Sequence, residues 1–225
     1  MWTAAGRKQQ LLELLVFCLL ITPSLVVSFL AGMPPNISFP QLAIASIARD
    51  IGLVCLIAFF LWRNGESVRL IGWRREHALR EAAIGLALFI PLFFTAQWVE
   101  QGFMAIGLHA PHGPEPFLTP RGSAQFGLAG VLVAVVAVSE ETIFRGYFML
   151  RVRELTRSTP AAVFVSTALF AVGHGYEGMA GLLTVAWIGA VFAVVYLWRG
   201  SLAAPMVMHF CQDFLGIVVA PLVQQ

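Results

Sequence analysis

The chain has few charged residues for its length. Only 12% of its 225 residues are Asp, Glu, Lys or Arg, whereas 59% are hydrophobic, and the mean hydropathy is +0.81. An ordinary soluble domain carries about 25% charged residues. The scarcity of charge therefore excludes an ordinary soluble domain and predicts a chain that crosses a membrane several times.

Cysteines and basic patches are also scarce. Cys18, Cys55 and Cys211 are the only cysteines in the sequence, and each lies in a separate apolar run. This spacing predicts three core residues rather than a disulfide framework or a zinc knuckle. The net charge is only +2, and no basic patch outside the loops between apolar runs is interleaved with aromatic residues. We therefore expect no nucleic-acid partner.

Long apolar runs fill most of the chain. They cover residues 11–31, 42–62, 82–107, 123–150, 160–175, 179–198 and 202–222. All but the short fifth run are near the length of about 20 residues that crosses a bilayer, and proline, glycine and charged residues separate them. The sequence predicts an all-α membrane bundle of about seven transmembrane helices, within a range of six to eight. We expect a single domain over residues 1–225.

Lys and Arg lie almost entirely on one side of the predicted bundle. One set of alternate loops carries Arg7, Lys8, Arg63, Arg69, Arg74, Arg75, Arg80, Arg151, Arg153, Arg157 and Arg199. The opposite loops carry only Arg121. Because cytoplasmic loops hold the excess of Lys and Arg, we expect a cytoplasmic N-terminus. The short loops suit a bacterial inner membrane.

Two charged segments each have two interpretations. Residues 66–81 mix apolar and charged residues, as in an amphipathic helix on the inner leaflet or in a solvated basic loop. Arg49 and Asp50 interrupt the second apolar run, either near the outer interface or as a pair that lines an intramembrane cavity. Four further titratable residues are expected at the interface or on the surface: Glu100, His77, His109 and His112.

The fourth run contains the stretch SEETIFR at residues 139–145. Ionisable residues inside a span usually face a polar cavity and carry function. Glu141 and Arg145 are four residues apart, so they share a helix face and can form an ion pair that fixes helix packing. Glu140 points about 100° away from that face. It lacks this partner and is a candidate general base or acid.

Two later runs contain histidine. Phe170 and His174 share one helix face, and His209 and Asp213 share another. At 1.5 Å per residue, Glu140, His209 and His174 lie about 16, 10 and 21 Å from the predicted cytoplasmic ends of their helices. At this similar depth they could either activate a water molecule beside a hydrolysable bond or merely hold helices together as polar contacts.

Three motifs follow one another in this region. EETIFR at 140–145 fits EExxxR, FAVGH at 170–174 fits FxxxH, and HFCQD at 209–213 fits HxxxN/D. In order and spacing, these motifs within residues 136–216 resemble the CPBP family. That family comprises CAAX prenyl endoproteases and bacteriocin-processing, abortive-infection-like proteins. The resemblance implies an intramembrane endopeptidase.

The resemblance also implies roles for the motif residues. Glu140 and His174 would polarise the attacking water, and His209 and Asp213 would stabilise the oxyanion or complete a metal site. An ionised Asp213 cannot donate a hydrogen bond to an oxyanion, so that role is open. The residues implied to support the site are Glu141, Arg145 and Phe170, the first two mainly by holding the motif helix in register.

The sequence allows more than one cofactor state, substrate and reaction class. Glu140, His174 and His209 would suit zinc by ligand type, whereas a metal-free, glutamate-activated water fits the same residues, so no cofactor is assigned. The expected partners are membrane lipid and a peptide or lipidated peptide, such as a prenylated tail or a leader peptide. The site is expected nearer the cytoplasmic side. The alternatives are a non-catalytic bacteriocin-immunity or scaffold protein, and a proton-coupled transporter.

Overall fold

The computed structural model describes residues 6–31, 37–110 and 116–223, and contains no strand among them. Its α-helices are α1 (Arg7–Val26), α2 (Phe39–Arg63), α3 (Ala78–Ala105), α4 (Gly122–Glu140), α5 (Met149–Thr156), α6 (Thr159–Val172), α7 (Gly178–Arg199), α8 (Ala203–Asp213) and α9 (Ala220–Val223). Three π-helical segments extend or join them: Val27–Ala31, Glu141–Phe148 and Phe214–Val219. The predicted all-α class is confirmed.

Six helical stretches are long and apolar enough to cross a membrane. They are Arg7–Phe29, Phe39–Arg63, Ala78–Ala105, Gly122–Thr156, Gly175–Arg199 and Ala203–Val223. The predicted short fifth run coincides with α6, whose 14 residues fall below the length of about 20 residues that spans a bilayer. Six spans and one shorter apolar helix confirm the expected polytopic bundle.

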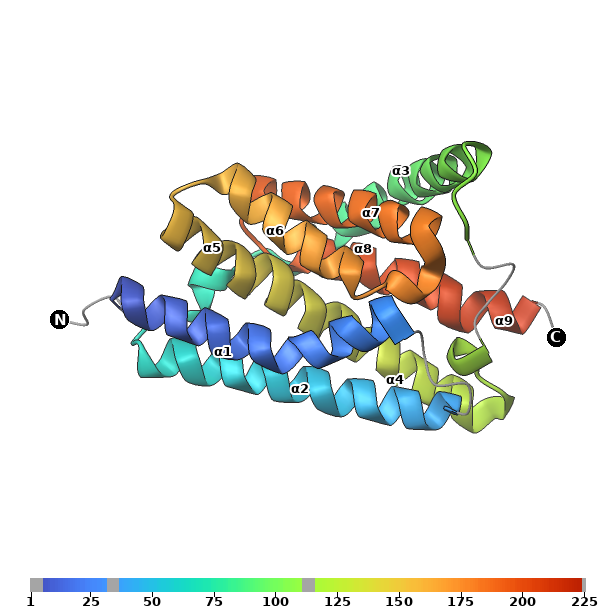
Figure 1. The fold of residues 1–225 in the computed structure, drawn as a ribbon, viewed down its shortest axis with the longest axis horizontal. Coiled ribbons are helices and arrows are strands. Elements are labelled where there is room, and N and C mark those ends of the chain that lie inside the picture. The colour runs from blue at the N-terminus through green and yellow to red at the C-terminus, as the bar shows by residue number, and fades with distance from the viewer. Residues whose placement is uncertain (1–5, 32–36, 111–115, 224–225) are drawn as a thin grey trace.

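The helices run along a common long axis (Figure 1). The α1 and α2 ribbons lie along one edge of the bundle, and α6 and α7 lie along the opposite edge. Close contacts join α3 to α8, α2 to α4 and α6 to α7. The start of α1 and the end of α9 lie at opposite ends of the molecule.

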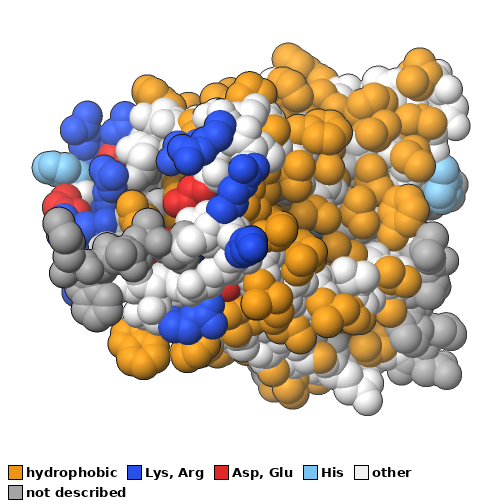
Figure 2. All heavy atoms as spheres, turned by 60° about the vertical axis from the view of Figure 1, so that its left-hand side comes forward, with side chains coloured by type: hydrophobic (Ala, Val, Ile, Leu, Met, Phe, Trp, Pro, Cys, Tyr) orange, Lys and Arg blue, Asp and Glu red, His pale blue; other side chains and the backbone are white. Residues whose placement is uncertain are grey.

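The surface divides into a charged end and an apolar belt. Figure 2 shows Lys and Arg side chains gathered at the end where α1 begins, and apolar side chains over the rest of this face. Large apolar residues such as Leu19, Trp62 and Phe164 are more than 70% exposed. Such exposure is costly in water, so these side chains face lipid and the protein is an integral membrane protein. Which side of the membrane the basic end faces remains a prediction.

The segment before α3 is a loop rather than an amphipathic helix. It contains one short 3₁₀ turn, Val68–Ile71, and α3 begins only at Ala78. The turn nevertheless packs on the helix that carries the first motif, because a Cβ on Gly146 would lie 3.0 Å from the carbonyl oxygen of Ile71. Of the two interpretations of residues 66–81, the basic loop holds.

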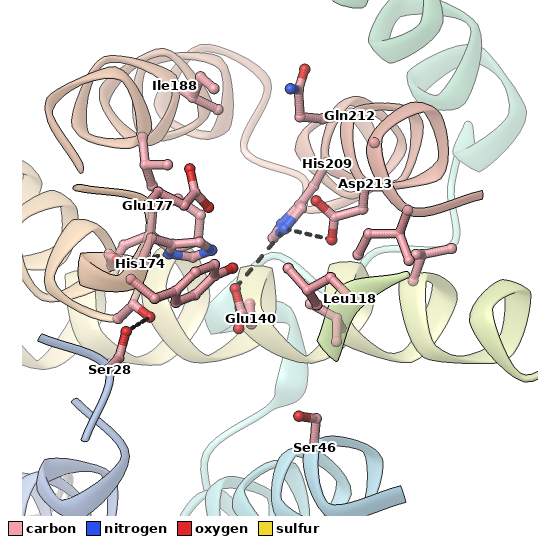
Figure 3. A pocket seen from close by; sticks show the side chains of 18 of the residues that line it. Ser28, Ser46, Leu118, Glu140, His174, Glu177, Ile188, His209, Gln212 and Asp213 are labelled. Carbon is pink, nitrogen blue, oxygen red and sulfur yellow. Dashed lines mark hydrogen bonds and ion pairs between the residues drawn. The ribbon is translucent and has the colours of Figure 1, made fainter. Parts of the chain in front are cut away.

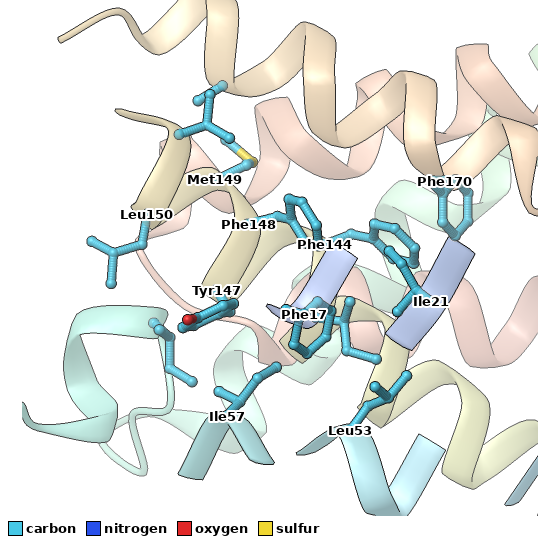
Figure 4. Close-up of a cluster of buried hydrophobic side chains, with 14 of the residues drawn as sticks. Phe17, Ile21, Leu53, Ile57, Phe144, Tyr147, Phe148, Met149, Leu150 and Phe170 are labelled. Atoms are coloured by element: carbon cyan, nitrogen blue, oxygen red, sulfur yellow. The ribbon is translucent and has the colours of Figure 1, made fainter. Parts of the chain in front are cut away.

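A cluster of aromatic side chains anchors the helix that carries the first motif (Figure 4). Phe17 of α1 contacts Tyr147 and Phe148, in each case with ring centroids 5.5 Å apart. Phe144 meets Phe170 of α6 edge to face at 5.4 Å. Burial of each such ring contributes about 1.5–3 kcal/mol. The cluster thus fixes the π-helical segment between α1 and α6.

The cysteines follow the core prediction only in part. Cys18 and Cys211 are half-buried, and Cys55 is exposed. The core prediction is therefore wrong for Cys55, which lies on the outer face of α2, where an apolar side chain contacts lipid instead of protein.

Candidate active site

The helix with the first motif changes its hydrogen-bond pattern at the motif. Gly122–Thr156 is one continuous helical stretch, and its middle part, Glu141–Phe148, is π-helical. A second π-helical segment, Phe214–Val219, begins directly after Asp213. Such segments are rare and are frequent at functional sites. Both helices that carry motif carboxylates therefore change from α-helical to π-helical hydrogen bonding next to those carboxylates.

Glu141 and Arg145 form the ion pair that their spacing predicts. Nη1 of Arg145 donates to Oε1 of Glu141 at 2.7 Å, and Nη2 donates to the carbonyl oxygen of Gly189 at 3.1 Å. The guanidinium lies 4.2 Å from the ring centroid of Phe170 and 5.2 Å from that of Phe192. Both charged side chains are fully buried, so this pair is part of the interior.

Glu141 also holds His209, a contact that the sequence analysis missed. Nδ1 of His209 lies 3.0 Å from Oε1 of Glu141. An ionised carboxylate only accepts hydrogen bonds, so Nδ1 carries a proton and Nε2 is directed elsewhere. Nε2 lies 3.4 Å from Oδ2 of Asp213 and 3.9 Å from Oε2 of Glu140. Glu141 thus orients a catalytic candidate and is more than a packing residue.

Glu140 faces a cavity and lacks strong partners. Its Oε2 atom is buried without a hydrogen-bond partner. Its two closest charged contacts, with Nη2 of Arg49 and Nε2 of His209, are both 3.9 Å long, which is too long for a hydrogen bond. The side chain is 14% exposed. This carboxylate is therefore free to bind a water molecule.

His174 follows the end of α6 and is held by its own helix. Its Nδ1 atom lies 2.9 Å from the carbonyl oxygen of Phe170, so Nδ1 donates and Nε2 presents a lone pair. The Phe170 ring lies 4.9 Å from the His174 ring and 5.7 Å from the His209 ring. Phe170 therefore contacts both histidines as well as Arg145, which gives the motif phenylalanine a physical role.

One cavity of about 810 Å³ brings the four catalytic candidates together. Glu140, His174, His209 and Asp213 all line it, and Figure 3 shows their side chains around the same space. They come from α4, the turn after α6, and α8. The structure thus joins the residues that the three motifs singled out, although they lie up to 73 positions apart in the chain, from 140 to 213.

Arg49 and Asp50 line the same cavity from α2. Nε of Arg49 donates to Oδ1 of Asp50 at 2.8 Å, and the Asp50 side chain is 1% exposed. Both residues lie near the middle of a 25-residue helix. Of the two interpretations of this pair, the cavity lining holds and the outer interface is wrong.

Other polar residues of the cavity were missed or misjudged. Glu100 lines it, which its predicted place at the interface did not indicate. Tyr176 and Glu177 also line it. Their place directly after the FxxxH motif is a signal that could have found them. His77 and His109 are exposed, as expected, and His112 lies outside the described residues.

The proposed metal ligands do not form a metal centre. Over the part of the chain that the structure describes, no group of three or more His, Cys, Asp or Glu side chains is arranged to hold a metal ion. Nδ1 of His209 is engaged by Glu141, and Nδ1 of His174 by a backbone carbonyl. Each ring could therefore bind an ion only through Nε2. Glu140, His174 and His209 share a cavity, but they are not grouped as the three or four ligands of one zinc ion.

Comparison with protein families places the site in context. Residues 122–215 match the model of the type II CAAX prenyl endopeptidase Rce1-like family. That is the resemblance that the motifs predicted. The match contains all three motifs and confirms the predicted relationship to the CPBP family over this part of the chain. The matched family is one of endopeptidases. No curated protein and no solved structure matches the chain.

Proposed function

We propose that this protein is an intramembrane endopeptidase in which Glu140 activates the attacking water. One observation carries the proposal: Glu140 lies in the cavity with Oε2 unbonded. A general base must be within hydrogen-bond reach of the proton that it abstracts. A water molecule on Oε2 would meet this condition and would lie beside the two motif histidines.

Glu140 can carry out both proton transfers of peptide hydrolysis. Glu140 takes a proton from the water as its oxygen attacks the carbonyl carbon, and the π electrons of the carbonyl move to its oxygen. When the carbonyl re-forms, the C–N bond breaks, and the departing amine nitrogen takes the proton from Glu140. The lone pair on Nε2 of His174 can accept a hydrogen bond from the same water. This orients the water toward the carbonyl carbon.

The cavity wall suits an apolar or lipidated peptide. Besides the polar residues, the lining includes Leu42, Leu132, Val133, Ile188 and Phe192. An extended peptide or an isoprenoid chain would bury its apolar surface there at about 25 cal/mol per Å². His209 is only six residues into α8, whose start lies at the basic end. We place the site nearer that end, on the cytoplasmic side of a bacterial inner membrane.

Cleavage by purified protein tests the proposal. The detergent-solubilised chain would be incubated with fluorogenic peptides of two kinds, farnesylated C-terminal peptides and apolar leader peptides. Loss of a general base lowers the rate about 10²- to 10⁴-fold, and we expect this loss in Glu140→Gln. Glu76→Gln changes an exposed loop carboxylate and should leave the rate unchanged. A folded parent protein that cleaves neither class of peptide would contradict the proposal.

A further inference from the structure

The lining of the cavity has more acidic than basic side chains. Among its described lining residues, five are acidic: Asp50, Glu100, Glu140, Glu177 and Asp213. Arg49 is the one lining residue in this set with a permanent positive charge. Peptide hydrolysis, the proposed reaction, builds negative charge on the carbonyl oxygen and needs a hydrogen-bond donor there. The acidic residues cannot provide that donor when ionised.

The motif histidines are also poor donors in this arrangement. Each places its Nδ1 proton on an acceptor, the carboxylate of Glu141 for His209 and the carbonyl oxygen of Phe170 for His174. In the neutral ring, Nε2 then carries a lone pair and only accepts. If His209 is protonated, its Nε2 proton faces Asp213 at 3.4 Å, and that carboxylate competes with any oxyanion. A second donor, free of such competition, would have to come from another element.

Arg49 has the required position. Its Nε atom is held by Asp50 at 2.8 Å, which fixes the guanidinium on α2. Its Nη2 atom lies 3.9 Å from Oε1 of Glu140, a distance that leaves its N–H groups free of a direct hydrogen bond to that carboxylate. A substrate carbonyl attacked by water from Glu140 would lie next to this guanidinium. Donors to an oxyanion act at about 2.7–3.1 Å from its oxygen. A substrate bound between Glu140 and Arg49 would place its carbonyl oxygen within this distance of the guanidinium.

We infer that Arg49 is a further catalytic residue, which donates from its guanidinium to the oxygen of the scissile carbonyl. The inference rests on the proposed function. When water attacks the carbonyl carbon, the π electrons move to this oxygen, and Arg49 stabilises the negative charge. When the C–N bond breaks, the charge returns to the carbonyl and Arg49 remains protonated. Asp50 is a positioning residue for Arg49.

Gln212 and Tyr176 are neutral donors in the cavity and are rivals of Arg49. Gln212 points away from Glu140 (Figure 3). Tyr176 lines the same cavity as Arg49 and Glu140, and its ring centroid lies 6.0 Å from that of His174. A substitution of Tyr176 therefore has to accompany any substitution of Arg49 in the test.

The experiment compares Arg49→Gln, Arg49→Lys and Tyr176→Phe with the parent and with Arg75→Gln, an exposed loop control. Two readouts are needed: kcat and KM on a cleaved peptide, and Kd for a phosphinic peptide, which mimics the anionic tetrahedral state. Loss of one oxyanion donor lowers kcat about 10²- to 10³-fold. We expect this for Arg49→Gln, with KM little changed and weaker phosphinate binding. Arg49→Lys should recover part of the rate.

Specific outcomes would overturn the inference. If Arg49 only keeps Glu140 ionised, the kcat lost in Arg49→Gln returns as pH rises, whereas a lost oxyanion donor lowers kcat at every pH. A parent-like kcat in Arg49→Gln, or a larger loss in Tyr176→Phe, also contradicts it. These results leave the proposed function standing, because the parent still cleaves and Glu140→Gln does not. Absence of cleavage by the folded parent overturns both.

Discussion

Glu141 and His209 are hydrogen-bonded at 3.0 Å across 68 positions of the chain. The same oxygen of Glu141 accepts from Arg145 at 2.7 Å. One buried carboxylate oxygen therefore joins the motif helix to α8 and holds two cationic or potentially cationic groups. The second glutamate of the first motif links the stability of the bundle to the orientation of a catalytic candidate.

Replacing Glu141 should destabilise the protein strongly. In Glu141→Gln the guanidinium of Arg145 stays buried without its counter-ion, which costs about 3–5 kcal/mol for a broken buried pair. We expect a clear fall in the unfolding temperature in detergent, measured by intrinsic fluorescence. Glu76→Gln breaks an exposed pair with Arg69 and should not change it. Equal unfolding temperatures for the two variants would show that the buried pair contributes nothing.

Replacing Phe170 should disturb the positions of the catalytic candidates without removing any of them. Its ring contacts the guanidinium of Arg145 and both histidine rings. Phe170→Leu removes a buried cation–π contact of about 2 kcal/mol and the ring that packs on both histidines. We expect a lower kcat with KM nearly unchanged. Phe164→Leu on the same helix alters a side chain that is 73% exposed and should leave kcat as it is. Equal kcat in both variants would contradict the role of Phe170.

Glycine at position 189 should be required for the close approach of Arg145. A Cβ there would lie 3.0 Å from the Phe170 ring and 3.1 Å from Nη2 of Arg145. Gly189→Ala therefore strains the pair, and overpacking costs about 1–3 kcal/mol. Gly127→Ala is the matched control, since nothing lies within 4 Å of that Cβ. Alanine there should stabilise α4 by helix propensity, up to about 1 kcal/mol. We expect thermal unfolding at a lower temperature for Gly189→Ala than for the parent, and at a higher temperature for Gly127→Ala.

The spans and the catalytic candidates could be predicted from the sequence because their signals are local. An apolar run, a break and an i, i+4 pair such as Glu141 with Arg145 need no knowledge of the neighbouring helices. The ordered motifs also indicated a resemblance to a family, and the match over residues 122–215 confirms this resemblance.

The remaining features depend on how helices pack. The approach of Arg49 to Glu140 follows from the packing of α2 on α4, and no local pattern fixes that contact. The link between Glu141 and His209 is equally long-range. The π-helical segment at Glu141–Phe148 rotates later side chains relative to an ideal α-helix. Spacing alone could therefore not show which way they face.

Reporter fusions test the predicted orientation. Eleven Lys and Arg residues lie on one set of alternate loops, and they gather at the end where α1 begins (Figure 2). By the excess of positive charge, a fluorescent protein fused before Met1 should fold in the cytoplasm and fluoresce. Alkaline phosphatase fused after Gln225 should be active, because the start of α1 and the end of α9 lie at opposite ends. The reverse pattern would invert the topology and the side of the site.

Chelation should leave cleavage intact if Glu140 activates water directly. Zinc needs three or four ligands, whereas no three suitable side chains are grouped to hold an ion among the described residues. We expect the cleavage rate to be the same before and after dialysis against 1,10-phenanthroline, and to be unchanged by added zinc. Glu140→Gln should remain inactive under both conditions, which separates loss of the base from loss of an ion. A rate that falls in the chelator and returns with zinc would mean that the cavity rearranges to bind metal. The role of Glu140 would then change from general base to ligand.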